Sequence, residues 1–455
     1  MPKVKAEGAT KKVLIITYYW PPAGGITVLR CLKIAKYLRQ FGWEPIIYTA
    51  ENAHYPFLDP SNEKDVPADL TVIRRPIWEP YAIYKKLTGK KKDANVNNVF
   101  YVKGEDPGLM HRLSVWIRSN FFIPDARASW IKPSVKFLLN YLQEHPVDAI
   151  FSDGPPHTNT RIATIVSQKT GIPWLADFQD PWTQVDYYQL LSLTKWGDKK
   201  HHRLEQESFH QAAAMTIVSP TWKKELEEIG ARNVHVIPWG YDPDDYQEPT
   251  ALTDHNLRLT HIGIMGYDRN PQAFFRVLAQ LKTKNHPLVD HISLQLIGQV
   301  DYSVKETYEE NNLEDQVVVV GSVAREKALA AAGESAVLLL LLNQQDNAKG
   351  RIPGKLFEYL ALRRPILAFG PTDSDVARIL TATQSGICLD YEDEAGTEQA
   401  LLRFWEQYQN GSLFQPTQGD IAPYSIIELT KKIAGLLDEI SEVSEVSEVR
   451  SESGG

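Results

Sequence analysis

The chain has little cysteine: Cys31 and Cys388 are its two cysteines, and both have apolar neighbours. Two cysteines so far apart in the sequence argue against a disulfide framework and against a cysteine-based zinc site. Such low cysteine content is consistent with a reducing compartment, the cytoplasm. Long apolar runs are also missing. The longest, residues 336–342, is much shorter than the about 20 residues that a membrane-spanning helix needs.

An excess of positive charge is absent as well, since 49 Lys and Arg stand against 57 Asp and Glu, for a formal net charge of −8. Such a balance argues against a nucleic-acid partner. Hydrophobic residues make up 43% of the 455 residues, enough for two domains that each bury a core. Residues 441–455 are of low complexity, and we expect a disordered tail there.

Short apolar segments recur along the chain with helical patterns between them, which is typical of parallel sheets covered by helices. The first strand is expected at residues 13–17, and the glycine-bearing turn PPAGG and a helix follow it. This turn is not the G-x-G-x-x-G of dinucleotide-binding domains. The other expected strands are 46–49, 70–73, 149–152, 174–177, 215–218, 234–237, 257–264, 292–297, 317–320, 337–341, 366–369 and 386–389.

Residues 350–370 (GRIPGKLFEYLALRRPILAFG) predict a loop, a short helix and a buried strand in quick succession. Pro353 and Gly354 suit a helix start, so residues 355–362 can form the helix and residues 366–369 the strand. The strand is short and apolar, as in a buried parallel sheet, and the continuous apolar runs at residues 292–297, 317–320 and 337–341 predict strands covered on both faces.

Charged side chains gather at the start of that helix. Arg351 and Lys355 lie at or near the positive end of its dipole, where anions bind. Glu358 follows Lys355 by about one turn, on the same face. Two cations and a carboxylate so placed can hold a diphosphate and a ribose, although a lone K-x-x-E is more often an exposed ion pair.

The stretch resembles the donor-binding segment of family-four-type glycosyltransferases of the GT-B fold, especially bacterial enzymes that build capsule, exopolysaccharide or lipopolysaccharide. Further motifs in matching order extend the resemblance from residue 13 to about residue 440: PPAGG, PDARASW, DFQDPW and PWGYD. It implies an α/β protein with two Rossmann-like domains whose parallel sheets face a central cleft. Residues 1–246 would form the acceptor-side domain and residues 257–415 the donor-binding domain, with a helix over residues 424–440 crossing back to the first.

The resemblance also implies a function: transfer of a hexose, with retention, from a nucleotide-diphosphate sugar to a glycan or polyprenyl-linked acceptor, in cell-surface polysaccharide synthesis. Donor-binding positions would be Gly24, Gly25, Gly266, Arg269, Val323, Arg351, Gly354, Lys355 and Glu358. Because Arg269 and Lys355 would neutralise the leaving diphosphate, and no D-x-D motif stands where one is expected, we expect neither a metal nor another cofactor.

Polar residues follow two strands of the first domain, at the sheet edge where open α/β sheets bind ligands. Asp153 and His157 follow residues 149–152, and Asp180 follows residues 174–177. The resemblance makes these three the catalytic candidates, facing the transferred sugar or the acceptor. A lone His157 is more often a capping or surface histidine.

Three positions depart from the family's pattern: Gly350 replaces the first of two glutamates, Gln179 replaces an arginine, and Trp239 replaces an asparagine. They keep two alternatives open, a sugar-nucleotide epimerase on the same fold and a non-catalytic sugar-nucleotide-binding homologue. The sugar, nucleobase and acceptor are not determined by the sequence.

Residues 108–123 (GLMHRLSVWIRSNFFI) contain no acid and predict a basic amphipathic helix, and residues 85–92 (KKLTGKKK) a basic loop. Such a surface can lie on an anionic membrane, and packing within its own domain is an equally good interpretation of the helix. We therefore expect a cytoplasmic protein with peripheral contact to the inner face of the membrane as one possibility.

Overall fold

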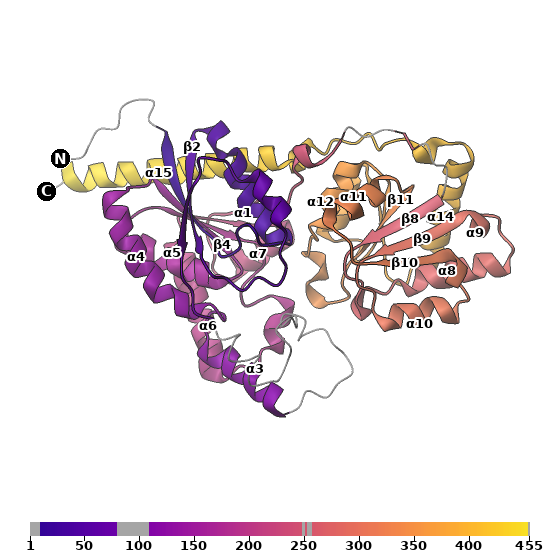
Figure 1. Ribbon diagram of the computed structural model, residues 1–455, viewed down its shortest axis with the longest axis horizontal. Helices are drawn as coiled ribbons and strands as arrows, with labels where there is room; N and C mark the ends of the chain where they lie inside the picture. The colour runs from indigo at the N-terminus through magenta and orange to yellow at the C-terminus, as the bar shows by residue number, and fades with distance from the viewer. Residues whose placement is uncertain (1–9, 80–108, 248–250, 253–256, 454–455) are drawn as a thin grey trace. The chain divides into compact units, whose positions relative to one another are not determined.

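The computed structural model describes residues 10–79, 109–247, 251–252 and 257–453. The chain divides into two compact units, Met1–Pro238 with Ile426–Gly455, and Trp239–Ser425. Each unit is built around one parallel sheet, which confirms the expected α/β class with two Rossmann-like sheets (Figure 1). Residues 239–246, assigned to the first domain from the sequence, lie in the second unit. The basic loop at residues 85–92 lies outside the described residues.

The first unit contains a seven-stranded sheet in the order β3-β2-β1-β4-β5-β6-β7. Its strands are β1 (Lys11–Ile16), β2 (Trp43–Ala50), β3 (Thr71–Arg75), β4 (Ala149–Gly154), β5 (Trp174–Phe178), β6 (Ala214–Ile217) and β7 (Val234–Val236). Every pairing between them is parallel, so the carboxyl ends of β4 and β5 meet at one edge. Asp153 and Asp177 are opposite each other in this register.

Helices cover both faces of this sheet. α1 (Ile26–Tyr37) and α15 (Ile426–Ser453) share one hydrophobic core with β1, β2, β4 and β5. α4 (Ile131–Glu144), α5 (His157–Thr170) and α6 (Lys195–Gln211) pack side by side over the other face (Figure 1). The shorter α7 (Pro220–Glu228) follows β6, and α3 (Leu109–Phe121) packs against α6.

The last helix differs from the sequence prediction at both ends. α15 starts at Ile426, because residues Ala422–Tyr424 form a separate 3-10 turn, and it continues to Ser453 where a disordered tail was expected from residue 441. No glycine or proline occurs between Leu436 and Ser453, so nothing in the local sequence breaks the helix. Leu429, Ile433 and Leu437 of its first half are fully buried in the core of the first unit.

The second unit contains a six-stranded parallel sheet in the order β10-β9-β8-β11-β12-β13. Its strands are β8 (Leu257–Ile262), β9 (Ile292–Ile297), β10 (Val317–Gly321), β11 (Val337–Leu341), β12 (Ile366–Phe369) and β13 (Gly386–Leu389). Its helices are α8 (Gln272–Thr283), α9 (Leu288–His291), α10 (Tyr302–Glu310), α11 (Arg325–Gly333), α12 (Lys355–Leu362), α13 (Asp375–Ala382) and α14 (Glu394–Gln409).

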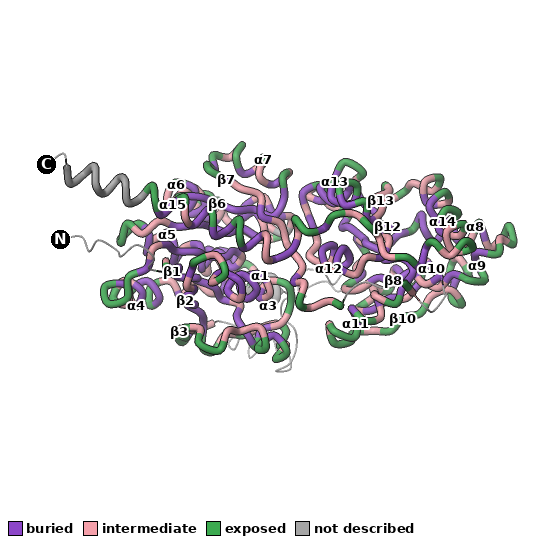
Figure 2. Tube along the Cα trace, turned by 90° about the horizontal axis from the view of Figure 1, so that it is seen from above, coloured by how far each residue is buried: buried purple, intermediate pink, exposed green. Residues whose placement is uncertain are grey.

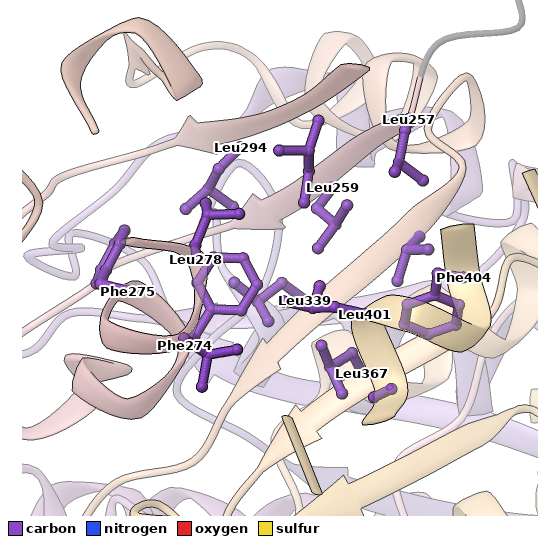
Figure 3. Packing of buried hydrophobic residues seen from close by; sticks show 14 of the residues in the cluster. Leu257, Leu259, Phe274, Phe275, Leu278, Leu294, Leu339, Leu367, Leu401 and Phe404 are labelled. Atoms are coloured by element: carbon purple, nitrogen blue, oxygen red, sulfur yellow. The ribbon is translucent and has the colours of Figure 1, made fainter. Parts of the chain in front are cut away.

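Leucines from four strands meet two helices in the larger core of this unit (Figure 3). α8 contributes Phe274, Phe275 and Leu278, and α14 contributes Leu401 and Phe404. A second cluster joins the other sheet face to α12 and α13. The strands are therefore mostly buried between helical layers, whose outer faces are exposed (Figure 2).

β10 is the exception, and here the prediction of a strand covered on both faces is wrong. Val318, Val319 and Val320 are 50%, 48% and 42% exposed. β10 is an edge strand that pairs only with β9, so side chains on both of its faces reach solvent. An apolar run gives no indication of where its strand stands in the sheet.

The stretch around α12 is confirmed, with the predicted helix over Lys355–Leu362 and the predicted strand over Ile366–Phe369. Arg363 ends the helix in the left-handed conformation, at φ 56°. Across the described residues, no helix combines the length and the apolar character needed to span a bilayer.

Candidate functional site

Lys355 is the first residue of α12, and Gly354 caps that helix without a side-chain hydrogen bond. The ammonium group of Lys355 lies against Gly263, which follows β8. A Cβ atom on Gly263 would stand 2.6 Å from Lys355 Nζ, and its φ of +113° favours glycine. Gly263 therefore makes the space that lets the cation lie at the carboxyl edge of the sheet.

Arg269 lies in the short turn Tyr267–Arg269, and its Nη1 donates to the carbonyl of Ile264 at 3.4 Å. Burial and, after it, the positive charge of Arg269 lower the pKa of Lys355 to about 7, while Glu358 opposes the shift. Because two neighbouring cations repel each other, an anion bound between them would relieve that repulsion. The structure thus brings together the two cations predicted to bind a diphosphate.

Glu358 has a different partner from the one that its spacing suggests. Its Oε1 accepts from Arg325 Nε at 2.8 Å, and Arg325 Nη1 lies 3.6 Å from Asp245 Oδ2. Arg325, the first residue of α11, was missed from the sequence because 33 residues separate it from Glu358. Its position directly after the loop that contains Val323 is the signal that a sequence reading could have used.

His261 was also missed, in the middle of the apolar strand β8. It is fully buried, and its Nδ1 is 2.9 Å from the carbonyl oxygen of Leu339. A carbonyl only accepts, so Nδ1 carries the proton and Nε2 is the unprotonated nitrogen, which has no partner. Burial and the nearby charge of Lys355 lower the pKa of His261 well below its usual value. The cation pair therefore stands beside a neutral imidazole.

The remaining donor candidates divide between the two units. In the second unit, Gly266 begins the turn that carries Arg269, Arg351 is half-buried just before α12, and Val323 is exposed. In the first unit, Gly24 donates its backbone N–H to Phe57 at 2.9 Å, and Gly25 (φ +91°) directly precedes α1.

Asp153 lies within the sheet of the first unit, fully buried. Its carboxylate accepts from Thr17 Oγ1 at 3.1 Å and from Asn159 Nδ2 at 2.7 Å. Burial and, after it, the neighbouring carboxylate of Asp177 raise the pKa of Asp153 to about 7. Asn159 belongs to α5, so Asp153 ties β4 to the first turn of the helix that carries His157.

His157 begins α5 and stacks on Trp182, with ring centroids 4.3 Å apart and an interplanar angle of 3°. Its Nδ1 is 3.4 Å from Thr160 Oγ1, and its Nε2 is buried without a hydrogen-bond partner. Burial lowers the pKa of His157 to about 3, so the ring is neutral at physiological pH. This stack therefore joins the segment between β4 and α5 to the DFQDPW segment after β5. Asp180, in the second loop, is half-buried two residues after β5.

One part of the chain matches a known protein family. Residues 92–245 match the model of Glycosyltransferase Family 4. The match lies almost wholly in the first unit and includes His157, Trp182 and the catalytic candidates Asp153 and Asp180. No curated protein sequence matches the chain.

Solved GT-B glycosyltransferases share the fold of both units at low sequence identity. HepE from Anabaena in complex with UDP-glucose is 13% identical, with a TM-score of 0.56 over 94% of this chain and 99% of that one. WaaG, a glycosyltransferase of lipopolysaccharide biosynthesis, is 14% identical, with a TM-score of 0.52 over 93% and 99%. S. aureus TarM, in a complex that includes UDP, is 11% identical, with a TM-score of 0.54 over 94% and 99%. The GT-B architecture is therefore confirmed for this chain.

The lowered pKa of Lys355 predicts a pH dependence of nucleoside-diphosphate binding. Below about pH 7 the ammonium is protonated, and above it the free protein loses this charge, so affinity should fall as pH rises from 7 to 9. Lys355→Arg keeps its proton throughout this range. We expect the ratio of the wild-type Kd to the Lys355→Arg Kd, measured by calorimetry, to increase with pH. Because titration of the diphosphate itself cancels in this ratio, a ratio that stays flat would contradict the assignment.

Proposed function

We propose that the chain is a retaining glycosyltransferase that moves a hexose from a nucleotide-diphosphate donor to a glycan or lipid-linked acceptor in cell-surface polysaccharide synthesis. The observation that carries the proposal is the pair Lys355 and Arg269, two neighbouring cations at the amino end of α12. The Glycosyltransferase Family 4 match in the first unit and the complex of HepE, which has a similar fold, with UDP-glucose support it.

The second unit contains residues proposed to bind the diphosphate of the donor and others proposed to bind its nucleoside. Lys355 and Arg269 would bind the diphosphate and stabilise its charge as the sugar leaves. Glu358, held by Arg325, would accept from the ribose hydroxyls, and Val323 lies in the loop proposed to approach the nucleobase. Two cations supply the countercharge that a metal provides elsewhere, so the proposal includes no metal or other cofactor.

A thermal-shift screen of nucleotide sugars with the full-length chain tests the donor class. We expect at least one nucleoside-diphosphate sugar to raise the melting temperature, and the nucleoside monophosphate of the same base to raise it less. Lack of stabilisation by every nucleotide sugar would contradict the proposed function. Conversion of the donor without acceptor would instead indicate an epimerase.

Retention of anomeric configuration is the next expected result. A retaining route in which the leaving diphosphate assists the incoming hydroxyl needs cations on the diphosphate more than a protein base, and Lys355 and Arg269 are those cations. An α-linked donor should therefore give an α-linked product, as seen by proton NMR. A β linkage would overturn this assignment and indicate a general base among Asp153, His157 and Asp180.

His157→Ala should lower kcat by about tenfold or more with little change in donor affinity. The reason is that His157 belongs to the first unit, whereas the side chains proposed to bind the diphosphate and the ribose, Lys355, Arg269 and Glu358, belong to the second. His235→Ala is a control, because His235 is half-buried on the edge strand β7 and its Nε2 is 2.8 Å from Asn233 Oδ1. An equal loss of turnover in both variants would argue against a role of His157 in the reaction.

Membrane contact is the last part of the proposal. α3 exposes Leu113, Trp116, Ile117 and Phe121, of which Phe121 is 65% exposed, and Trp196 at the start of α6 is exposed too. Asn120 joins these elements, since its side chain donates to Ser192 and accepts from Thr194. An apolar surface of this kind, near Lys195 and Arg118, fits the interface of an anionic bilayer.

We therefore expect the protein to co-sediment with vesicles of phosphatidylglycerol at low salt and to be released as salt increases. Trp116→Ser with Ile117→Ser should weaken this binding severalfold, because both side chains lose contact with the apolar phase. Val319→Ser, on the exposed edge strand of the second unit, is the matched control. Absence of vesicle binding even at low salt would limit α3 to packing within its own unit.

A further inference from the structure

A cavity of about 410 Å³ opens in the first unit beside the amino end of α5. Its volume lies within the about 300–1,000 Å³ of typical small-molecule sites. Its walls come from segments far apart in sequence: the end of α3, the PDARASW segment, the two loops after β4 and β5, and α6. Six ring side chains line it: Tyr19, Phe122, His157, Trp182, Tyr188 and His201.

His201 on α6 lines this cavity, and its hydrogen bond to Trp182 determines which ring nitrogen carries the proton. Trp182 Nε1 donates to His201 Nδ1 at 3.1 Å, and an indole nitrogen can only donate. His201 Nδ1 is therefore the acceptor, and the proton of the neutral ring is on Nε2. Burial lowers the pKa of His201 to about 4, although Asp198 opposes the shift, so this tautomer persists at physiological pH.

Trp182 connects the two histidines of the cavity wall. Its indole stacks on His157 and donates to His201, so the hydrogen bond to His201 fixes the plane against which His157 rests. Both imidazoles are more than nine-tenths buried. His157 Nε2 is buried without a hydrogen-bond partner, and His157 is one of the residues that line the cavity.

Carboxylates already lie against two positive features of the cavity, the amino end of α5 and Arg127. Asp125 accepts from the backbone N–H of Thr158 at 2.8 Å and from its hydroxyl at 2.9 Å, so a carboxylate already neutralises the positive end of α5. Arg127 lies 3.6 Å from Glu79 and stacks over the ring of Tyr18. Arg118 also lines the cavity, as does Asp125.

We propose that this cavity binds an uncharged pyranose ring of the acceptor, with one hydroxyl bonded to His157 Nε2 and another accepting from His201 Nε2. A pyranose offers C–H faces to aromatic rings, whose π faces are negative, and hydroxyl groups that both donate and accept. The identification of this sugar as the acceptor rests on the proposed function. The affinity of the cavity for a saccharide does not depend on the proposed function.

Direct binding to the full-length chain tests the inference, with methyl glycosides of glucose, galactose and N-acetylglucosamine as probes and with inorganic phosphate and glycerol phosphate for comparison. We expect saturation-transfer NMR to detect at least one glycoside and neither phosphate compound. His201→Phe keeps the ring but removes the N–H, and it should weaken glycoside binding by about three- to tenfold. His210→Phe is the control on the same helix, since its ring bonds only to the carbonyl of Gln206.

In a transfer assay His201→Phe should raise the KM of the acceptor and leave the KM of the donor unchanged, which a loss of folded protein would not do. If this variant does not fold, the half-buried Tyr19→Ala at the same cavity provides the measurement. Failure of every glycoside to bind overturns the inference, as does competition by phosphate. Glycoside binding without sugar transfer from any nucleotide sugar would refute the proposed function alone. Transfer with an unchanged acceptor KM in His201→Phe would refute the cavity alone.

Discussion

Lys355→Ala and Arg269→Ala should each weaken nucleoside-diphosphate binding by about tenfold to hundredfold. Each change removes a charge-assisted hydrogen bond worth about 1.5–3 kcal/mol. Both side chains belong to one cation pair, so the double variant should lose less than the product of the two single losses. Isothermal calorimetry with the nucleoside diphosphate gives each Kd directly. Glu358→Ala should also weaken binding of the free nucleoside, which neither cation contacts in this proposal.

Lys349→Ala is the matched control for this experiment. Lys349 lies six residues before Lys355, but its ammonium is exposed and pairs with Asp373 at 2.6 Å. Its removal should change the Kd by less than about twofold. If Lys355→Ala, Arg269→Ala and Glu358→Ala all bound the diphosphate with wild-type affinity, the donor site would have to lie elsewhere on the chain.

Asp177→Ala should lower the free energy of unfolding of the first unit by about 3–5 kcal/mol. Both oxygens of Asp177 accept from Arg30, at 2.6 Å each, and Thr216 also donates to one of them. Both partners of this ion pair are almost fully buried. Removing one leaves the other charge uncompensated in a medium of low dielectric constant. Urea unfolding, monitored by a signal that reports on the first unit, measures the change in the free energy of unfolding.

Asp438→Ala is the matched control, because it removes one partner of an ion pair at the surface. Asp438 and Lys11 are 2.7 Å apart, but both are more than a third exposed, so we expect a loss of less than about 1 kcal/mol. Arg30→Met combined with Asp177→Leu should recover much of the stability that Asp177→Ala loses, because it removes both buried charges. Equal destabilisation by Asp177→Ala and Asp438→Ala would show that burial adds nothing to the pair.

The sequence by itself determined the local elements of this protein. Strands such as Ile292–Ile297 and Val337–Leu341 have their predicted bounds, as does the helix Lys355–Leu362. Continuous apolar runs, proline and glycine act within a few residues of themselves, so a linear pattern is sufficient to identify them. The cations Arg269 and Lys355 were found for the same reason, since each belongs to a motif a few residues long.

Only the tertiary structure decided which side chains meet. It placed β10 at an edge of its sheet, made Arg325 the partner of Glu358, and buried Asp153 between Thr17 and Asn159. It also brought Trp182 onto both His157 and His201, which are 44 positions apart in the sequence. These pairings depend on the order of strands and the packing of helices across the sheet. Contacts between residues far apart in sequence set that order, and no local pattern records them.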